Sequence, residues 1–224
     1  MSAFDERWTA LPTAAALVVV LLAYAALFAG SELLHRAFAV EAETTRQLVH
    51  VVGSLLAIPL PLLLGRPLGI AVAVLFAGLQ AWSRHRGILG SVHGVSRPTY
   101  GAIAFPLGIA LVAVLAHSFA QYAFGVLVLG LADPAAGLVG QRWGRPIAHW
   151  PTSKSLAGSA AFLAVTLVLA TAYAVAGTDV AVRPLLLLAS GLVVTVVESV
   201  LGRGLDDLAL PTAAAGAYTW LLVG

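Results

Sequence analysis

The sequence predicts an all-α protein, a polytopic integral membrane bundle of about seven to eight transmembrane helices. The chain has 224 residues, of which 60% are hydrophobic and only 10% are charged, and its mean hydropathy of +0.97 is far above that of soluble domains. Several apolar runs reach the roughly 17 to 25 residues that cross a bilayer. Backbone amides inside hydrocarbon must find their partners within their own segment, so the runs are expected to be helices.

Eight apolar segments are expected to span the membrane within a single domain, 1–224, which shows no internal repeat. The stretch IPLPLLLGRPLG predicts a tight turn between the second and third, because its prolines and glycines interrupt a helix. Asp5, Glu6 and Arg7 precede the first segment in place of a basic region, so it is expected to be retained and not cleaved as a signal peptide. The expected spans are Leu11–Phe28, Leu48–Leu64, Leu68–Trp82, Ala102–Phe119, Tyr122–Val139, Leu156–Ala176, Pro184–Leu201 and Leu208–Val223.

The basic residues predict the orientation of these spans. Nine of the twelve Lys and Arg residues fall in the odd-numbered loops, so these loops are expected to face the cytoplasm, with both termini on the other side. The pI of 9.3 follows from this bias and requires no nucleic-acid partner. The chain has no cysteine, which excludes disulfides and thiol catalysis. The nine residues are Arg36, Arg46, Arg84, Arg86, Arg97, Arg142, Arg145, Lys154 and Arg203.

Two charged stretches in the odd loops are candidates for phosphate binding. In ETTRQLVHVVG, Glu43, Arg46 and His50 lie three to four residues apart and share one helix face, although a membrane-interface anchor explains them as well. The loop SRHRGILGSVHGVSRPTYGAIAFPLG places Arg97 just before a helix start, where arginines and backbone amides form a phosphate receptor. An ordinary basic cytoplasmic loop is the alternative.

The stretch LADPAAGLVGQRWGR places a carboxylate, Asp133, in an apolar segment. A carboxylate there costs several kcal/mol unless it faces a cavity, a cation or a metal, and this cost indicates a functional site. Pro134 follows it and predicts a break at the cytoplasmic end of the fifth helix. Gly137, Gly140 and Gly144 indicate either close helix packing or room for backbone amides to approach phosphates.

Two further stretches supply a cation and carboxylates on the same expected side. Lys154, in TSKSLAGS, is the only lysine of the chain, and a compact ammonium at a helix start suits the grip on a transferring phosphoryl group. An interfacial cation is the alternative. In ESVLGRGLDDLALP, Glu198, Asp206 and Asp207 could supply the oxygen ligands that Mg²⁺ prefers, unless they form a solvated acidic turn.

In this order the stretches resemble the polyprenol kinase family, which includes phytol, farnesol and dolichol kinases and CTP-dependent diacylglycerol kinases. The elements RQLVH, SRPTYGAIAFPLG, DPAAGLVGQRWGR, KSLAGS and ESVLGRGLDDLALP are similar to the family's motifs, and the resemblance covers about Glu43 to Pro211. The chain departs from the pattern at Gln47, where the family usually has lysine, and at Asp207, where it usually has asparagine.

The resemblance implies an enzyme that transfers the γ-phosphoryl group of a nucleoside triphosphate, CTP in the family, to a membrane lipid alcohol such as phytol, farnesol, geranylgeraniol or a polyprenol. Asp133, Lys154, His50 and Asp206 are the expected catalytic residues, with the general base left open among His50, Asp133 and Asp206. Mg²⁺ is the expected cofactor, held by Asp133, Glu198, Asp206 and Asp207. The expected nucleotide-binding residues are Arg46, Arg97, Gly137, Gly140, Arg142, Gly144, Ser155 and Gly158.

Four other functions fit parts of the pattern. A diacylglycerol kinase uses the same donor and metal, and a CTP:lipid-phosphate cytidylyltransferase differs from a kinase in releasing a CDP-lipid. A small-molecule transporter explains buried charges, but it predicts an internal repeat and polar residues near the bilayer midplane, whereas these charges cluster toward one face. A purely structural membrane subunit is the remaining alternative. The sequence leaves the nucleotide, the alcohol and the oligomeric state open.

Overall fold

A computed structural model describes residues 11–95, 99–145, 152, 154–177 and 183–222. Throughout these residues the regular structure is helical and contains no β-strand, which confirms the predicted all-α class. The helices pack around an apolar core that includes Tyr122, Phe124, Phe162 and Leu210.

Among the described residues, the first half of the chain forms six helices and the second half forms four long helical segments, one of them composite. The first six are α1 (Thr13–Ala37), α2 (Ala42–Ala57), α3 (Leu60–Leu64), α4 (Arg66–His85), α5 (Gly90–His93) and α6 (Gly101–Leu115). The second set is α7 (Phe119–Leu127), the π-helical segment η1 (Val128–Ala132), α8 (Asp133–Trp143), α9 (Leu156–Gly177), α10 (Pro184–Val200) and α11 (Leu205–Leu222).

Four of the described helices are long and apolar enough to cross a membrane, namely Thr13–Ala37, Arg66–His85, Phe119–Trp143 and Leu156–Val175. The apolar helices α6 and α10 are shorter. These helices identify a membrane protein, as the composition predicts. The number of passes and the side on which the termini lie stay predictions.

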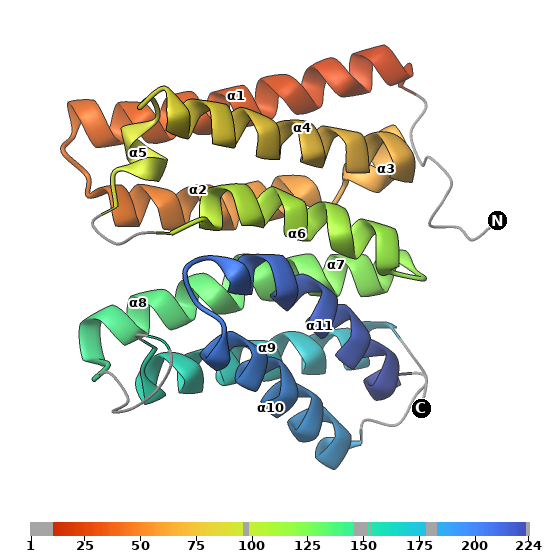
Figure 1. The fold of residues 1–224 in the computed structure, drawn as a ribbon. Helices are drawn as coiled ribbons and strands as arrows, with labels where there is room; N and C mark the ends of the chain where they lie inside the picture. Colours follow the sequence, from red (N-terminus) through yellow and green to blue (C-terminus); the bar gives the residue numbers. More distant parts are fainter. Residues whose placement is uncertain (1–10, 96–98, 146–151, 153, 178–182, 223–224) are drawn as a thin grey trace.

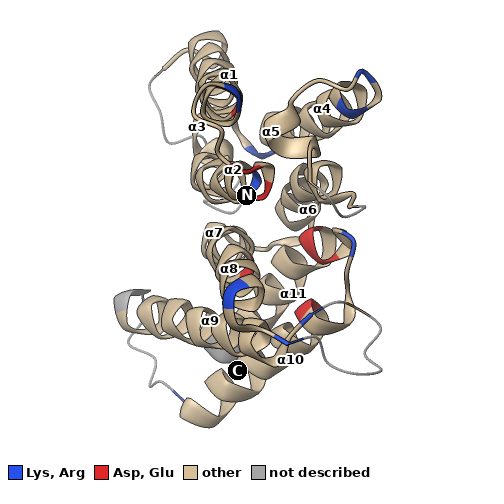
Figure 2. Ribbon diagram, turned by 90° about the vertical axis from the view of Figure 1, so that its left-hand side faces the viewer, with Lys and Arg blue, Asp and Glu red and all other residues tan. Residues whose placement is uncertain are grey.

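The two halves of the bundle meet along α6 and α2 (Figures 1 and 2). Helix α6 packs against α4 of its own half and against α11 of the other, and α2 contacts η1 and α7. The beginning of α1 and the end of α11 lie at the same end of the bundle, opposite the beginnings of α2, α6 and α11 (Figure 1). The charged loops are therefore collected at the end away from the described termini.

Helix boundaries differ from the expected spans mainly at the charged ends. Helix α1 runs nine residues beyond Phe28, and α2 begins at Ala42, so Arg36 and Arg46 lie in helices and not in the first loop. The expected turn between the second and third spans is confirmed but short. It contains α3 and is completed by Gly65, whose φ of 79° favours glycine.

The expected break at Asp133 is wrong. Asp133 is helical, with φ −65° and ψ −47°, and one apolar helix runs from Phe119 to Trp143. The π-helical turns of η1 come directly before it and shift the hydrogen-bond register, so Pro134 falls near the start of α8, where a missing N–H is tolerated. The residue before a proline usually prefers extended backbone geometry. Asp133 is helical instead, and the helix continues through it.

Two tyrosines anchor the middle of α2. The Tyr24 hydroxyl donates to the Gly53 carbonyl at 2.9 Å, and the Tyr122 hydroxyl donates to the Ala57 carbonyl at 2.7 Å. Pro61 has no N–H to offer the Ala57 carbonyl, so the hydroxyl replaces the missing helical bond. These bonds tie α2, which carries His50, to both α1 and α7.

Candidate active site

The predicted charged stretches meet in one cavity of about 1050 Å³. It opens between α2, α8, the segment before α9, the end of α10 and the beginning of α11, at the end of the bundle seen in Figure 2. Eleven of the fourteen expected site residues line it. They are Arg46, His50, Asp133, Gly137, Gly140, Lys154, Ser155, Gly158, Glu198, Asp206 and Asp207.

Lys154 lies among three carboxylates that come from three different helices. Its ammonium donates to Glu198 Oε1 at 2.5 Å and to Asp206 Oδ2 at 2.7 Å, and it lies 3.9 Å from Asp133 Oδ1. Glu198 is 1% exposed, whereas 21% of the lysine side chain remains accessible. Burial lowers the pKa of Lys154, but the carboxylates outweigh this effect and hold the pKa above its ordinary value. The ammonium is therefore charged at neutral pH.

Glu198 uses both of its oxygens inside the protein. One accepts from Lys154, and the other accepts from the Ser159 hydroxyl at 3.2 Å. A buried carboxylate whose two oxygens both accept hydrogen bonds holds the lysine ammonium in one position. Separating the ion pair would leave an uncompensated buried charge. The expected role of Glu198 as a metal ligand stays a prediction.

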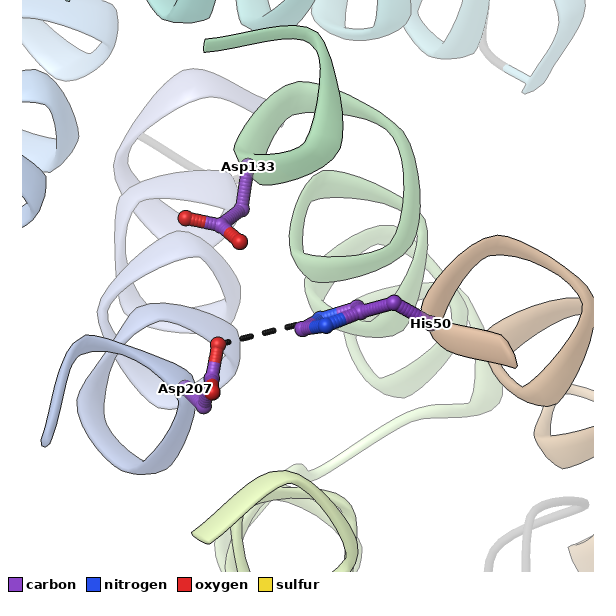
Figure 3. A group of neighbouring side chains, drawn as sticks. All are labelled: His50, Asp133 and Asp207. Atoms are coloured by element: carbon purple, nitrogen blue, oxygen red, sulfur yellow. Dashed lines mark ion pairs between the residues drawn. The ribbon is translucent and has the colours of Figure 1, made fainter. Parts of the chain in front are cut away.

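His50, Asp133 and Asp207 form a second group beside the lysine (Figure 3). Each offers one ligand atom, and the three atoms lie within 4.8 Å of one another. His50 Nε2 is 3.7 Å from Asp207 Oδ1 and has no hydrogen-bond partner among the described residues. Asp133 comes from the start of α8 and Asp207 from the first turn of α11, so the group joins three helices.

The carboxylates fit a magnesium ion. Among the described residues, the cavity is lined by six carboxylates and by three Lys or Arg side chains, a surplus of negative charge that would repel a triphosphate arriving without cations. Mg²⁺ is typically held by one or two carboxylates together with substrate phosphates, and it prefers oxygen to nitrogen. Asp133 and Asp207 meet that requirement and leave the His50 nitrogen free for another task.

Glu43 organises the opposite wall of the cavity. It accepts from Arg46 at 2.7 Å and from the amides of Gln47 and Gln141 at 3.4 Å each. The side-chain amide oxygen of Gln47, Oε1, is buried and has no hydrogen-bond partner among the described residues. The guanidinium of Arg46 is buried, but Glu43, Asp207 and Asp133 raise its pKa above the ordinary value, so it stays cationic.

The small residues of α8 and α9 serve helix packing as well as the cavity. A Cβ on Gly158 would lie 2.9 Å from the Ala136 carbonyl oxygen, and one on Gly140 would lie 3.6 Å from Gly158 Cα. Ser155 Oγ accepts from the Gly158 N–H at 3.1 Å and leaves no room for a side chain on Gly144. The sequence left two roles open for these glycines, close helix packing and room for phosphates to approach. The contacts between α8 and α9 show the packing role.

Two expected nucleotide-binding residues do not line the cavity, and a third cannot be placed. Arg142 is exposed and lies over the Trp143 ring at 5.4 Å, and Gly144 packs against Ser155 without lining the cavity. Arg97 lies outside the described residues. A phosphate role for these residues stays a prediction.

The structure adds two site residues that the sequence did not single out. The Ser159 hydroxyl donates to Glu198. Ser159 is the last residue of KSLAGS, so this motif could have identified it as a site residue. Gly101 starts α6 against the Asp207 carboxylate, which a side chain at this position would displace. A carboxylate at the beginning of a helix is favoured by the helix dipole.

Comparison with known proteins supplies one relative of known activity. The chain is 32% identical over 207 residues to a protein from Synechocystis sp. named phytol kinase, and the match covers 85% of this chain and 87% of the relative. No family model matches the chain, and no solved structure matches it.

Proposed function

The chain belongs to the polyprenol kinase family, and from that premise we propose that it phosphorylates an isoprenoid alcohol dissolved in the membrane. The donor is a nucleoside triphosphate, for which we propose CTP, and the cofactor is Mg²⁺. In this reaction the bond between the γ-phosphorus and the leaving nucleoside diphosphate breaks. A new bond forms from the alcohol oxygen to the phosphorus, and the hydroxyl proton passes to a base of the protein.

Lys154 and Arg46 provide the positive charge for the phosphates. Lysine has three N–H donors, and Glu198 and Asp206 accept from it at 2.5 and 2.7 Å, which leaves the third donor for a phosphate oxygen. The two carboxylates also hold the ammonium at one position in the cavity. A cation positioned before the substrate arrives stabilises the transferring group without reorganisation.

Asp133 and Asp207 would hold the magnesium ion. When bound, the ion neutralises charge on the phosphates and lowers the barrier to transfer. The two carboxylates lie near His50 in the same cavity, so donor and acceptor would meet at this point.

His50 is the proposed base. Its Nε2 is buried, has no hydrogen-bond partner among the described residues and lies 3.7 Å from Asp207. A neutral imidazole nitrogen in that position accepts the proton of a hydroxyl within hydrogen-bond reach. Asp207 then stabilises the imidazolium that forms.

The observation that carries the proposal is the meeting of Lys154, Asp133, Asp207 and His50 in one cavity. They come from four separate segments of a chain whose homologue is a phytol kinase. Phosphoryl transfer needs mainly positioning and charge neutralisation, and these residues supply a cation, two carboxylates and a base.

The test is transfer by the purified protein in lipid nanodiscs. The protein is given Mg²⁺, one of CTP, ATP or UTP, and farnesol, geranylgeraniol or phytol. The expected product is the isoprenyl monophosphate, formed fastest with CTP. Folded protein that yields no lipid phosphate with any pair contradicts the proposal, and a CDP-lipid made from a lipid phosphate would identify a cytidylyltransferase instead.

A further inference from the structure

We propose that a small apolar cavity beside His50 holds the first isoprene unit of the acceptor. The site thereby selects single-chain isoprenoid alcohols over diacylglycerol. The inference rests on the proposed function and deepens it, since it names the part of the acceptor that the protein recognises.

The apolar cavity lies mainly between α1, α2, α4 and α6, and one residue each from α3 and α5 completes its walls. Its walls include Tyr24, Gly53, Ala73, Phe76 and Phe105, with Tyr24 and Phe76 in ring contact at 4.6 Å between centroids. The Tyr24 hydroxyl already donates to the Gly53 carbonyl, so it presents an apolar ring to the interior. These walls suit a hydrocarbon and offer little to a polar group.

His50 stands at the boundary between the two cavities and lines both, as does Arg46. Its ring packs edge-on against Phe105, with 4.3 Å between centroids, while its Nε2 lies 3.7 Å from Asp207 on the polar side. An alcohol whose first carbons occupy the apolar cavity would therefore present its oxygen to the imidazole. The hydroxyl would reach the polar cavity, where the phosphates are proposed to bind.

The size of the apolar cavity limits what enters it. Its volume of about 50 Å³ compares with about 10–15 Å³ for one water on the same measure, so three to five water-sized groups fit. One five-carbon isoprene unit has about this size. The hydroxyl of diacylglycerol sits within a few bonds of two ester groups, which do not fit the space and would lie mostly against apolar side chains.

The later isoprene units of the tail do not need a binding pocket in the protein. Lipid chains are as apolar as leucine side chains, so a tail that leaves the cavity between the helices is solvated by the bilayer. Discrimination is therefore expected at the hydroxyl end and not along the tail. Alcohols of ten to twenty carbons should be phosphorylated with similar kcat/KM at equal mole fraction in the membrane.

The test fills the cavity from Gly53. A Cβ at this position would lie 3.4 Å from Phe105 Cε1, an ordinary contact, so the first carbon of a larger residue fits and the rest occupies the cavity. Gly53→Leu is expected to raise the KM for geranylgeraniol about tenfold or more and to change the KM for the nucleotide less than twofold. Gly78→Leu is the matched control, because nothing lies within 4 Å of that α4 position, and it should behave as wild type.

Three results of the kinetic measurements would overturn the inference. They are an unchanged KM for the alcohol in folded Gly53→Leu protein, an equal rise in Gly78→Leu, and a wild-type protein that prefers diacylglycerol to isoprenols. Crosslinking with a diazirine-bearing isoprenol provides a readout without catalysis. Labels on α2 and α6 that Gly53→Leu removes would support the cavity, even if the protein is inactive. Inactivity would then refute only the proposed function. Labels confined to other helices would refute the cavity.

Discussion

The ion pair between Lys154 and Glu198 allows stability and catalysis to be separated. Lys154→Met removes the cation that contacts Glu198 at 2.5 Å, and the remaining carboxylate is 1% exposed. Loss of one partner from such a buried pair costs about 3–5 kcal/mol. For a chain of this size, about 2–4 °C of melting temperature corresponds to each kcal/mol, so Tm should fall by about 6–20 °C.

A double variant distinguishes the two roles of the lysine. Lys154→Met with Glu198→Gln removes the stranded charge but keeps an acceptor for the Ser159 hydroxyl. Tm should recover most of its loss, short of wild type because Asp206 still lacks its partner. Kinase activity should stay at least about 100-fold below wild type, because the ammonium positioned for the transferring group is gone and only the Arg46 guanidinium remains.

Both quantities are measured on one preparation, with Tm from thermal unfolding in detergent and activity from lipid phosphate formed at saturating nucleotide. A Lys154→Met protein whose Tm lies within 2 °C of wild type would refute the buried ion pair. Activity that recovers together with Tm in the double variant would refute the role of the lysine in phosphoryl transfer.

The remaining predictions concern the metal, the base and the helix contact behind Asp207. Asp133→Asn should lower the rate about 100-fold or more without a large change in Tm, because this carboxylate is partly exposed and its main proposed task is metal binding. His50→Gln should lower kcat about 100-fold and change KM little, as expected for loss of a general base. Removal of divalent metal with EDTA should abolish activity, and Mg²⁺ should restore it. Gly108→Ala should cost about 1–3 kcal/mol, since a Cβ there would clash with the Asp207 backbone, whereas Gly216→Ala has open space and should be neutral.

Each of these predictions has an opposing result. Near-normal activity of Asp133→Asn would move the metal site elsewhere, and an unchanged kcat in His50→Gln would leave one of the aspartates as the base. Activity that survives EDTA would contradict a metal-dependent transfer. Equal Tm values for the two alanine variants would show that the contact between α6 and α11 tolerates a side chain.

The fold class and most of the candidate site can be predicted from the sequence because the chain is so apolar. In a chain this apolar, each charged residue is costly, so the charged stretches stand out and their loops alternate between the two ends of a bundle. Counting basic residues by loop placed His50, Asp133, Lys154 and Asp206 on one side, and the structure brings all four to one cavity. Their cytoplasmic orientation is still a prediction.

Other features depend on contacts between distant segments. The sequence assigns Glu198 to a metal because carboxylates bind Mg²⁺, yet only the packing of α9 against α10 shows that Lys154 and Ser159 occupy its oxygens. Pro134 predicts a helix break, but the π-helical turns before Asp133 shift the hydrogen-bond register so that the helix continues through the proline. The apolar cavity beside His50 is lined by residues of six helices, α1 to α6, and has no local sequence signal.

The most direct test of the central claim follows the γ-phosphate itself. Purified protein in nanodiscs is given γ-labelled nucleoside triphosphate, Mg²⁺ and geranylgeraniol, in parallel with the Asp133→Asn variant. The predicted result is labelled geranylgeranyl monophosphate from the wild type, formed at least about 100-fold more slowly by the variant. Folded wild-type protein that leaves the label entirely off the lipid, with every nucleotide and every isoprenoid alcohol offered, would contradict the account.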